Sequence, residues 1–208
     1  MSWSVRDALS GRSVFVTGHT GFKGSWLAIW LERLGARVTG YSLAPPTQPN
    51  LFQAAGVRDL LVGHHQADIR DAARLNRALE ESDCDVVFHL AAQSLVLPSY
   101  ERPRETFEVN VIGTAGVLDA VRARRRPCVV VVVTSDKCYE NRAQVWGYRE
   151  NDPLGGRDPY SASKAAAEIV LAAYRRSFFP SDRIAAHGVK LASARSGNAI
   201  GGGDWAQD

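Results

Sequence analysis

The clearest candidates for chemistry in this sequence are a tyrosine and a lysine four residues apart, Tyr160 and Lys164. That spacing places two side chains on one face of a helix. A phenol has an ordinary pKa near ~10 and is a poor base at neutral pH, but a neighbouring ammonium favours the phenolate. The pair could then remove the proton of a hydroxyl group. Because the same spacing is common on helix surfaces, it becomes informative only beside a cofactor-binding motif.

A second group of polar residues follows an apolar run, Cys128–Val133, which is expected to form a core strand. Ser135, Asp136 and Lys137 come directly after it, and open α/β sheets bind ligands at the carboxyl ends of their strands. Serine and aspartate also form turns and cap helices, which is the structural alternative. If this strand end lies near Tyr160, Ser135 completes a serine, tyrosine and lysine set for hydride transfer, with an acid and a second lysine left over.

The sequence GHTGFKG lies between an expected strand and an expected helix, and its glycines are Gly18, Gly21 and Gly24. Glycine permits a tight turn and the close approach of a pyrophosphate to the helix N-terminus, so the motif indicates dinucleotide binding. An ordinary glycine-containing turn is the alternative, and Lys23 could either serve a phosphate or point to solvent. The loop residues expected to contact the cofactor are Gly18, His19, Gly21, Phe22, Lys23 and Gly24.

The adenosine end of the cofactor site is expected at the ends of the second and third strands. The second strand ends without the acidic residue that takes the adenosine ribose in many dinucleotide sites, so the choice between NAD and NADP is open. Ser42 could instead bond a ribose hydroxyl. Asp68 and Ile69 could bracket an adenine by a hydrogen bond and an apolar contact, or Asp68 could be a helix N-cap.

Small and amide side chains after the fourth strand indicate further cofactor contacts. Ala91 and Ala92 would let the backbone approach a cofactor, although packing alone could also select alanine. Gln93 follows them and belongs to the predicted cofactor site. Asn110 stands inside an expected helix, where its amide could bond the neighbouring strand's backbone or be exposed, and we expect the buried bond.

Apolar runs alternate with segments of helical period, which predicts a doubly wound parallel sheet of Rossmann type with helices on both faces. The expected strands are Ser13–Thr17, Arg37–Tyr41, Leu60–Gly63, Asp85–Leu90, Cys128–Val133 and Ile184–Ala194. The expected helices are Gly21–Leu34, Asp71–Glu81, Arg104–Arg125 and Pro159–Ser177, the last with Asp158 as its N-cap. Cys128–Val133 shows no alternation of polar and apolar residues and is expected to be buried on both faces.

Composition narrows the class of protein further. The chain has 208 residues, of which 45% are hydrophobic and 23% charged, as in a globular domain. It contains no apolar run of about eighteen residues and no apolar centre of a signal peptide, so neither a membrane span nor secretion is expected and the expected location is the cytoplasm. A net charge of +3 favours neither nucleic acid nor a membrane as a partner. The three cysteines lack metal-ligand spacing, so reduced thiols and no metal site are expected.

Several motifs, in order along nearly the whole chain, resemble the CDP-glucose 4,6-dehydratase family. The GxxGxxG spacing and the YxxxK pair belong to the wider extended short-chain dehydrogenase/reductase superfamily, which includes the NAD-dependent epimerases and dehydratases. The runs SDKCYEN, GYRENDPLGG and GNAIGGGDWA are more specific to the CDP-glucose enzymes.

The resemblance implies a redox-neutral dehydration of CDP-glucose to CDP-4-keto-6-deoxyglucose with bound NAD. Tyr160 would take the proton of the C4 hydroxyl as hydride leaves C4, supported by Lys164 and Ser135. Water would then be eliminated across C5 and C6, and the hydride would return to C6. By the same resemblance, Asp136 is the acid for the departing C6 hydroxyl. Lys137 stands where related dehydratases have a glutamate, and it is either the C5 base, which we favour, or the group that stabilises the enolate.

Members of this family are longer, with a smaller C-terminal part that holds the nucleotide after the GGGDW region. Residues 1–208 are therefore expected to form an NAD-binding Rossmann domain that stops before the substrate-binding part. The alternatives are another nucleotide-sugar dehydratase, an epimerase, or a non-catalytic dinucleotide-binding module. Analogy with relatives predicts a homodimer that pairs through residues 104–125 and 159–177.

Overall fold

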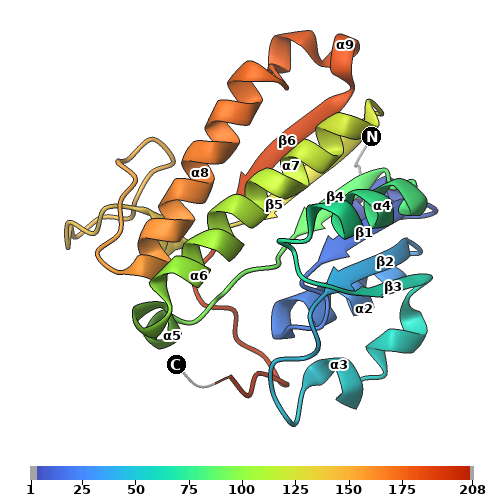
Figure 1. Cartoon of the computed structure of the whole chain (residues 1–208), viewed down its shortest axis with the longest axis horizontal. Coiled ribbons are helices and arrows are strands. Elements are labelled where there is room, and N and C mark those ends of the chain that lie inside the picture. The colour runs from blue at the N-terminus through green and yellow to red at the C-terminus, as the bar shows by residue number, and fades with distance from the viewer. Residues whose placement is uncertain (1–3, 207–208) are drawn as a thin grey trace.

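The computed structural model describes residues 4–206, which form a six-stranded parallel sheet in the order β3-β2-β1-β4-β5-β6 (Figure 1). The order reverses between β1 and β4, and ligands of doubly wound sheets bind at such a switch point. The predicted Rossmann-type sheet is confirmed. The strands are β1 (Ser13–Thr17), β2 (Arg37–Ser42), β3 (Gly63–Gln66), β4 (Val86–His89), β5 (Cys128–Val133) and β6 (Val189–Ala194).

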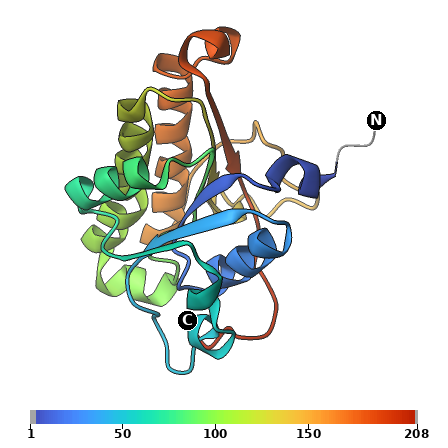
Figure 2. The same cartoon turned by 90° about the vertical axis from the view of Figure 1, so that its right-hand side faces the viewer.

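Helices cover both faces of the sheet (Figure 2). On one face, α2 (Phe22–Arg33) packs with α3 (Leu51–Ala54) and the 3-10 turn η1 (Val57–Leu60). The opposite face carries α4 (Ala72–Ser82), α7 (Gly113–Arg124) and α8 (Pro159–Ser177). Further short helices are α1 (Val5–Leu9), α5 (Val96–Glu101), α6 (Pro103–Phe107), the 3-10 turns η3 (Asp136–Cys138) and η4 (Ser181–Arg183), and α9 (Ile184–His187). None of the helices within residues 4–206 is long and apolar enough to cross a membrane.

The alternation of side chains along β1 divides the core into two clusters. Val14 and Val16 belong to the cluster that contains Leu31 of α2, whereas Phe15 points to the other face and joins the cluster that contains Leu118 of α7. These side chains are at most 1% exposed. A parallel sheet covered on both faces therefore needs apolar residues at consecutive positions, which is why this strand reads as an uninterrupted apolar run.

Local signals explain where the helices begin and end. The Asp71 carboxylate accepts a hydrogen bond from the Arg74 amide (3.0 Å) and caps α4, and the Asp158 carboxylate accepts one from the Ser161 amide (2.8 Å) and caps α8. Such caps satisfy amides that the first turn leaves without a partner. α2 ends before Gly35, which has φ +88°. The predicted bounds of these helices are confirmed to within a residue or two.

Two predicted strands are displaced. A strand is expected at Leu60–Gly63, but the turn η1 extends to Leu60 and β3 begins only at Gly63. The side chains of Val57 and Leu61 are buried in the hydrophobic cluster beneath α2. Ile184–Ala194 is expected to carry one strand, and β6 occupies only the second half of this range. Its first residues instead form α9, Gly188 turns the chain with φ +72°, and β6 starts at Val189.

The predicted helix Arg104–Arg125 is present but irregular. It runs through α6 and α7 with a π-helical turn, η2 (Glu108–Ile112), between them. Such turns are rare and often occur at functional sites. Asn110 lies in this turn and is 2% exposed, so the irregular turn directs an amide side chain into the interior.

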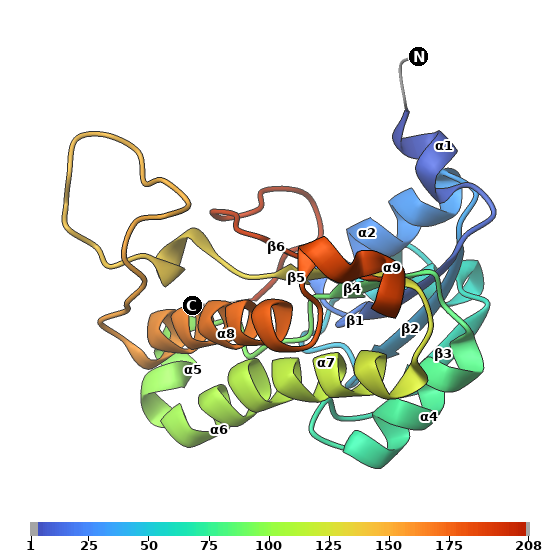
Figure 3. The ribbon, with the colours of Figure 1, turned by 90° about the horizontal axis from the view of Figure 1, so that it is seen from above.

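The expectation that Cys128–Val133 is buried on both faces is wrong. Val130 and Val132 are buried in the cluster beneath α7 and α8, but Val129, which points the other way, is 39% exposed. Helices therefore cover β5 on one face. The segment that follows η3, residues 139–157, projects away from the sheet (Figure 3).

Candidate functional site

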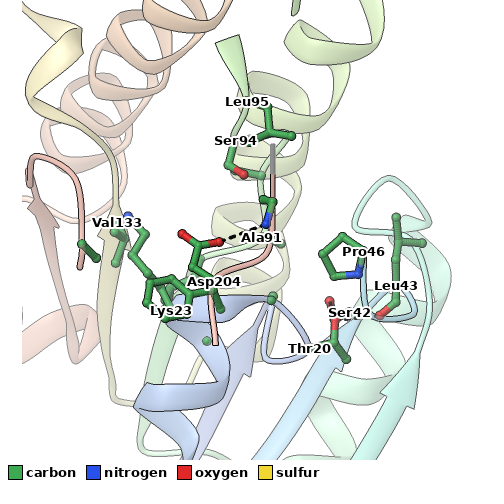
Figure 4. Close-up of a pocket in the computed structure, with 18 of the residues that line it drawn as sticks. Thr20, Lys23, Ser42, Leu43, Pro46, Ala91, Ser94, Leu95, Val133 and Asp204 are labelled. Carbon is green, nitrogen blue, oxygen red and sulfur yellow. Dashed lines mark hydrogen bonds between the residues drawn. The ribbon is translucent and has the colours of Figure 1, made fainter. Parts of the chain in front are cut away.

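A cavity of about 560 Å³ opens at the carboxyl ends of the strands, at the switch point of the sheet. The glycine-rich loop, the ends of β2, β4 and β5, and the start of α8 form its wall. Figure 4 shows the side chains of Thr20, Ser42 and Pro46 at one end of the cavity and that of Val133 toward the other. The predicted site residues on its wall are Gly18, Gly21, Phe22, Lys23, Gly24, Ser42, Asp68, Ile69, Ala91, Ala92, Ser135, Lys137, Tyr160 and Lys164.

The glycine loop is shaped by close backbone approach. Gly18 has φ +77°, and a Cβ there would lie 2.7 Å from the Ala91 amide nitrogen. A Cβ on Gly24 would collide with the Gly18 carbonyl oxygen. Gly21 is the N-cap residue of α2 and offers no side chain to the first amides of the helix, so these amides can take an anion. Lys23 adds a positive charge in the same turn. The loop therefore suits a pyrophosphate.

The far end of the cavity combines hydroxyl, carboxylate and apolar groups. The Ser42 and Thr20 hydroxyls are hydrogen-bonded (2.8 Å), and both residues line the cavity. The Asp68 carboxylate accepts hydrogen bonds from the Arg70 amide (2.8 Å) and, on both oxygens, from the Arg70 guanidinium (2.6–3.1 Å), and this hydrogen bonding holds the pKa of Asp68 below its ordinary value. The N-cap alternative for Asp68 is wrong, because Asp71 caps α4. Asp68 and Ile69 both line the cavity, and their contact with an adenine stays a prediction.

Three residues predicted to bind cofactor lie behind the cavity wall. His19 is fully buried, with Nε2 2.8 Å from Nδ1 of His64. Asn110 Oδ1 accepts a hydrogen bond from the Gln93 amide (2.8 Å), and its Nδ2 donates to the Gln93 carbonyl (2.9 Å) and to Ser163 Oγ (2.8 Å). Asn110 thus makes a buried bond, as predicted, but its backbone partner is Gln93 in the loop after β4 and not the strand itself. Asn110 and Gln93 fasten the loop after β4 to α8 from behind, and direct contact of these three residues with a cofactor stays a prediction.

Tyr160 and Lys164 stand together in the first turns of α8. They are 8% and 7% exposed, and Lys164 Nζ lies 5.9 Å from the centre of the Tyr160 ring. Burial, together with the charge of Lys23, lowers the pKa of Lys164 to about 8. An ammonium that is poorly solvated gains more from a neighbouring anion. The structure thus places the Lys164 ammonium beside the Tyr160 ring on the wall of the cavity.

The residues after β5 do not all reach the cavity. Ser135 is 5% exposed and lines it; its hydroxyl accepts a hydrogen bond from the Lys137 amide (3.2 Å) and donates to Asp136 Oδ1 (3.2 Å). Lys137 lines it too, and its Nζ donates to Asn198 Oδ1 (3.1 Å). The Asp136 side chain is 57% exposed and lies outside the wall. Ser135 therefore caps the turn, as the structural alternative predicts, and also lines the cavity; its catalytic role stays a prediction.

A segment not predicted from the sequence also lines the cavity: residues 195–206, which we call the strap. It leaves β6 beside η3 and reaches α2, where Trp26 Nε1 donates to the Gly202 carbonyl (3.0 Å). Asn198 and Asp204 of the strap line the cavity. The family motif GNAIGGGDWA lies in this segment and could have indicated that it contributes to the site. No group of three or more potential metal ligands occurs in the described range 4–206.

A parallel sheet in this order, with a glycine-rich first turn and a tyrosine–lysine pair on the cavity wall, defines the extended short-chain dehydrogenase/reductase class. The sequence profile of the GDP-mannose 4,6-dehydratase family matches residues 15–182. The chain belongs to this family.

Individual relatives agree with that assignment. CDP-glucose 4,6-dehydratase of Salmonella typhimurium is 54% identical over 95% of this chain, and dTDP-glucose 4,6-dehydratase of Xanthomonas campestris is 31% identical over 78%. The crystal structure of UDP-glucose 4-epimerase from Brucella ovis in complex with NAD superposes with a TM-score of 0.72 at 29% identity, over 89% of this chain and 51% of the epimerase. The chain spans 55% of the Salmonella enzyme and 49% of the Xanthomonas enzyme.

Proposed function

We propose that the chain is the cofactor-binding and proton-transfer part of an enzyme that dehydrates CDP-glucose to CDP-4-keto-6-deoxyglucose. One observation carries the proposal: Ser135, Tyr160 and Lys164 face the same cavity as the glycine-rich loop. The choice of substrate rests on 54% identity to the Salmonella CDP-glucose 4,6-dehydratase, of which the chain spans 55%.

The cavity fits a dinucleotide. The α2 N-terminus and Lys23 suit the pyrophosphate, Ser42 suits a ribose hydroxyl, and Asp68 with Ile69 suits the adenine. We infer NAD because the similar Brucella ovis epimerase was solved with NAD and because the end of β2 offers a hydroxyl. When bound, NAD would accept a hydride from the sugar and return it.

The protein's own groups would move the protons. Tyr160, as phenolate, takes the proton of the C4 hydroxyl, and the Lys164 ammonium stabilises that phenolate before the transfer. Ser135 lines the same cavity and in this proposal would hydrogen-bond the C4 oxygen as the charge on that oxygen changes. Oxidation at C4 makes the C5 proton acidic, and loss of that proton with the C6 hydroxyl releases water.

The elimination would use the two residues after Ser135. Asp136 is our candidate for the acid that protonates the departing hydroxyl, and its exposed side chain must turn toward the cavity to do so. Lys137 is our candidate at C5, either as base or as the cation that stabilises the enolate. Its ammonium already donates to Asn198 Oδ1, so the strap holds it on the cavity wall.

The test is to incubate the purified chain with NAD and CDP-glucose, with UDP-glucose and dTDP-glucose in parallel, and to look by mass spectrometry for a sugar nucleotide lighter by one water. Product from CDP-glucose alone supports the proposal. Product from another nucleotide sugar corrects the substrate. NAD binding without product from any of them supports a non-catalytic module and contradicts the proposal for this chain.

A 4-epimerase is the second candidate, since the Brucella ovis structure that resembles this fold carries that activity. An epimerase needs no acid for a departing hydroxyl. Asp136→Asn therefore separates the two: it should abolish dehydration but leave epimerisation largely intact.

We also propose a cytoplasmic homodimer. The surface of the helices predicted to pair carries exposed apolar side chains, Ile112 (63%) on the α6–α7 helix and Ile169 (60%) on α8. The three cysteines are buried free thiols, as expected in a reducing compartment. Gel filtration of the protein and of Ile169→Glu at micromolar concentration tests the dimer; a monomeric wild type contradicts it.

A further inference from the structure

A buried carboxylate on α8, that of Glu168, has no part in the chemistry proposed above. Glu168 is 5% exposed and follows Lys164 by four residues and Tyr160 by eight, so the three lie along one face of the helix. A buried carboxylate is costly unless hydrogen bonds and opposite charge compensate it. The donors that bind the Glu168 carboxylate therefore show which elements it connects.

Three donors at the ends of β5 and β6 bind this carboxylate. Thr134 Oγ1 donates to Oε1 (2.5 Å), and Ser193 Oγ (3.0 Å) and Arg195 Nη2 (2.9 Å) donate to Oε2. Burial alone would raise the pKa of Glu168, but these hydrogen bonds outweigh it and hold the pKa below the ordinary value. Glu168 is thus ionised at neutral pH and joins α8 to the ends of both β5 and β6.

Arg195 extends the network beyond the strands. Its Nη1 donates to the Tyr139 hydroxyl (2.8 Å) and to the Glu150 carbonyl (3.1 Å), and its guanidinium lies 5.0 Å from the centre of the Tyr139 ring. Both partners belong to the segment after η3. The ion pair between Glu168 and Arg195 therefore connects the helix, two strand ends and two points of the projecting segment, Tyr139 and Glu150.

The network links the two elements that carry the proposed proton-transfer residues: the end of β5, which is followed by Ser135, and α8, which carries Tyr160 and Lys164. Thr134 immediately precedes Ser135, and Glu168 is on the helix that carries Tyr160. A displacement of about 1 Å between reacting groups can reduce a rate about 10²-fold. We propose that Glu168 is a positioning residue that sets how α8 lies along the end of β5, and so sets the position of Tyr160 and Lys164 relative to Ser135.

The assignment of proton transfer to Tyr160 rests on the proposed function, so the first measurement does not depend on turnover. The ionisation of the Tyr160 phenol is measured in the full chain by ultraviolet difference titration against Tyr160→Phe. Glu168→Gln keeps the side-chain shape but removes the charge, and Thr134→Val removes a single donor. In both variants we expect the Tyr160 midpoint to rise by about half a pH unit or more, because the phenol is no longer held beside the Lys164 ammonium.

The second measurement is steady-state turnover of CDP-glucose. We expect kcat to fall about tenfold or more in Glu168→Gln, with KM and the Kd for NAD within about twofold, because Glu168 is absent from the cavity wall. Leu79→Ala, a fully buried residue of α4, is the control: it should lower the unfolding temperature and leave both the midpoint and kcat unchanged.

The outcomes separate the two proposals. If Glu168→Gln and Thr134→Val change only the unfolding temperature, as Leu79→Ala does, Glu168 is structural and the positioning role is wrong. If wild type turns over no nucleotide sugar, the proposed function fails for this chain, and the Tyr160 titration still decides the role of Glu168.

Discussion

Acid should unfold this protein through its buried histidines, and His89 shows why. Thr17 Oγ1 accepts hydrogen bonds from the Leu90 and Ala91 amides (3.1 Å each), so its own proton goes to His89 Nδ1 at 2.7 Å. His89 Nε2 then donates to Thr114 Oγ1 (3.1 Å). The ring is therefore neutral, and a proton added at Nδ1 would face the hydroxyl oxygen of Thr17, which already accepts two hydrogen bonds from backbone amides.

The size of the effect follows from two such rings. Burial lowers the pKa of His89 to about 3, with a smaller contribution from the charge of Lys164, and burial beside His64 lowers that of His19 to about 3 as well. In the unfolded chain both regain a pKa near ~6.5. Below about pH 6.5 these two histidines bind protons in the unfolded state but not in the folded state, so the free energy of unfolding falls as pH falls. Between pH 7 and pH 5 the loss is about 2 kcal/mol for each histidine, or about 4 kcal/mol together.

Urea unfolding followed by tryptophan fluorescence at pH 7, 6 and 5 measures this loss. His89→Gln removes one of the two titrating rings, so its loss over the same range should be about 2 kcal/mol. The reasoning is refuted if wild type is equally stable at pH 7 and pH 5, or if His89→Gln has the same pH dependence as wild type.

Three further predictions address the cavity. Gly18→Ala should lower the free energy of unfolding by about 1–3 kcal/mol and weaken NAD binding, since φ is +77° and the new Cβ would meet the Ala91 amide; chemical denaturation and calorimetric titration check both. Lys23→Gln removes a charge that, after burial, lowers the pKa of Lys164, so the alkaline limb of kcat against pH should move upward; an unmoved limb contradicts this. Lys137→Arg should retain elimination if Lys137 acts as a cation and lose it, as Lys137→Ala should, if Lys137 is a base.

Elements with strong local signals were predictable from the sequence. β1 and α8 have the bounds expected for them, because an apolar run and an Asp-Pro N-cap are decided by neighbouring residues. β3 was misplaced because its polar residues, His64 and His65, carry little strand signal. They become a strand only by pairing with Gly40 and Tyr41 of β2.

The residues of the functional site were largely predictable from the sequence, but which of their side chains reach the cavity was not. The spacing of Tyr160 and Lys164 is local, and so is the glycine motif. Whether a side chain reaches the cavity depends on long-range packing, which is why Asp136 points to solvent although its neighbours line the wall. The ion pair of Glu168 with Arg195 joins residues far apart in the chain, and no spacing rule predicts it.

The strap has a consequence for the order in which parts of the molecule form and open. The contact between Trp26 and Gly202 joins residues 176 positions apart in the chain. Closing so long a loop is entropically costly, so we expect this contact to form only after β1 to β6 have assembled and brought its two ends close together. Beyond Arg195, its side chains contribute little burial, since Ile200 is 98% and Trp205 43% exposed. The strap should therefore dock last in folding and detach first, at a free energy well below that of global unfolding. In hydrogen exchange, amides of residues 196–206 would then exchange long before those of β5, and the cavity would exchange its contents through this local opening while the sheet stays intact.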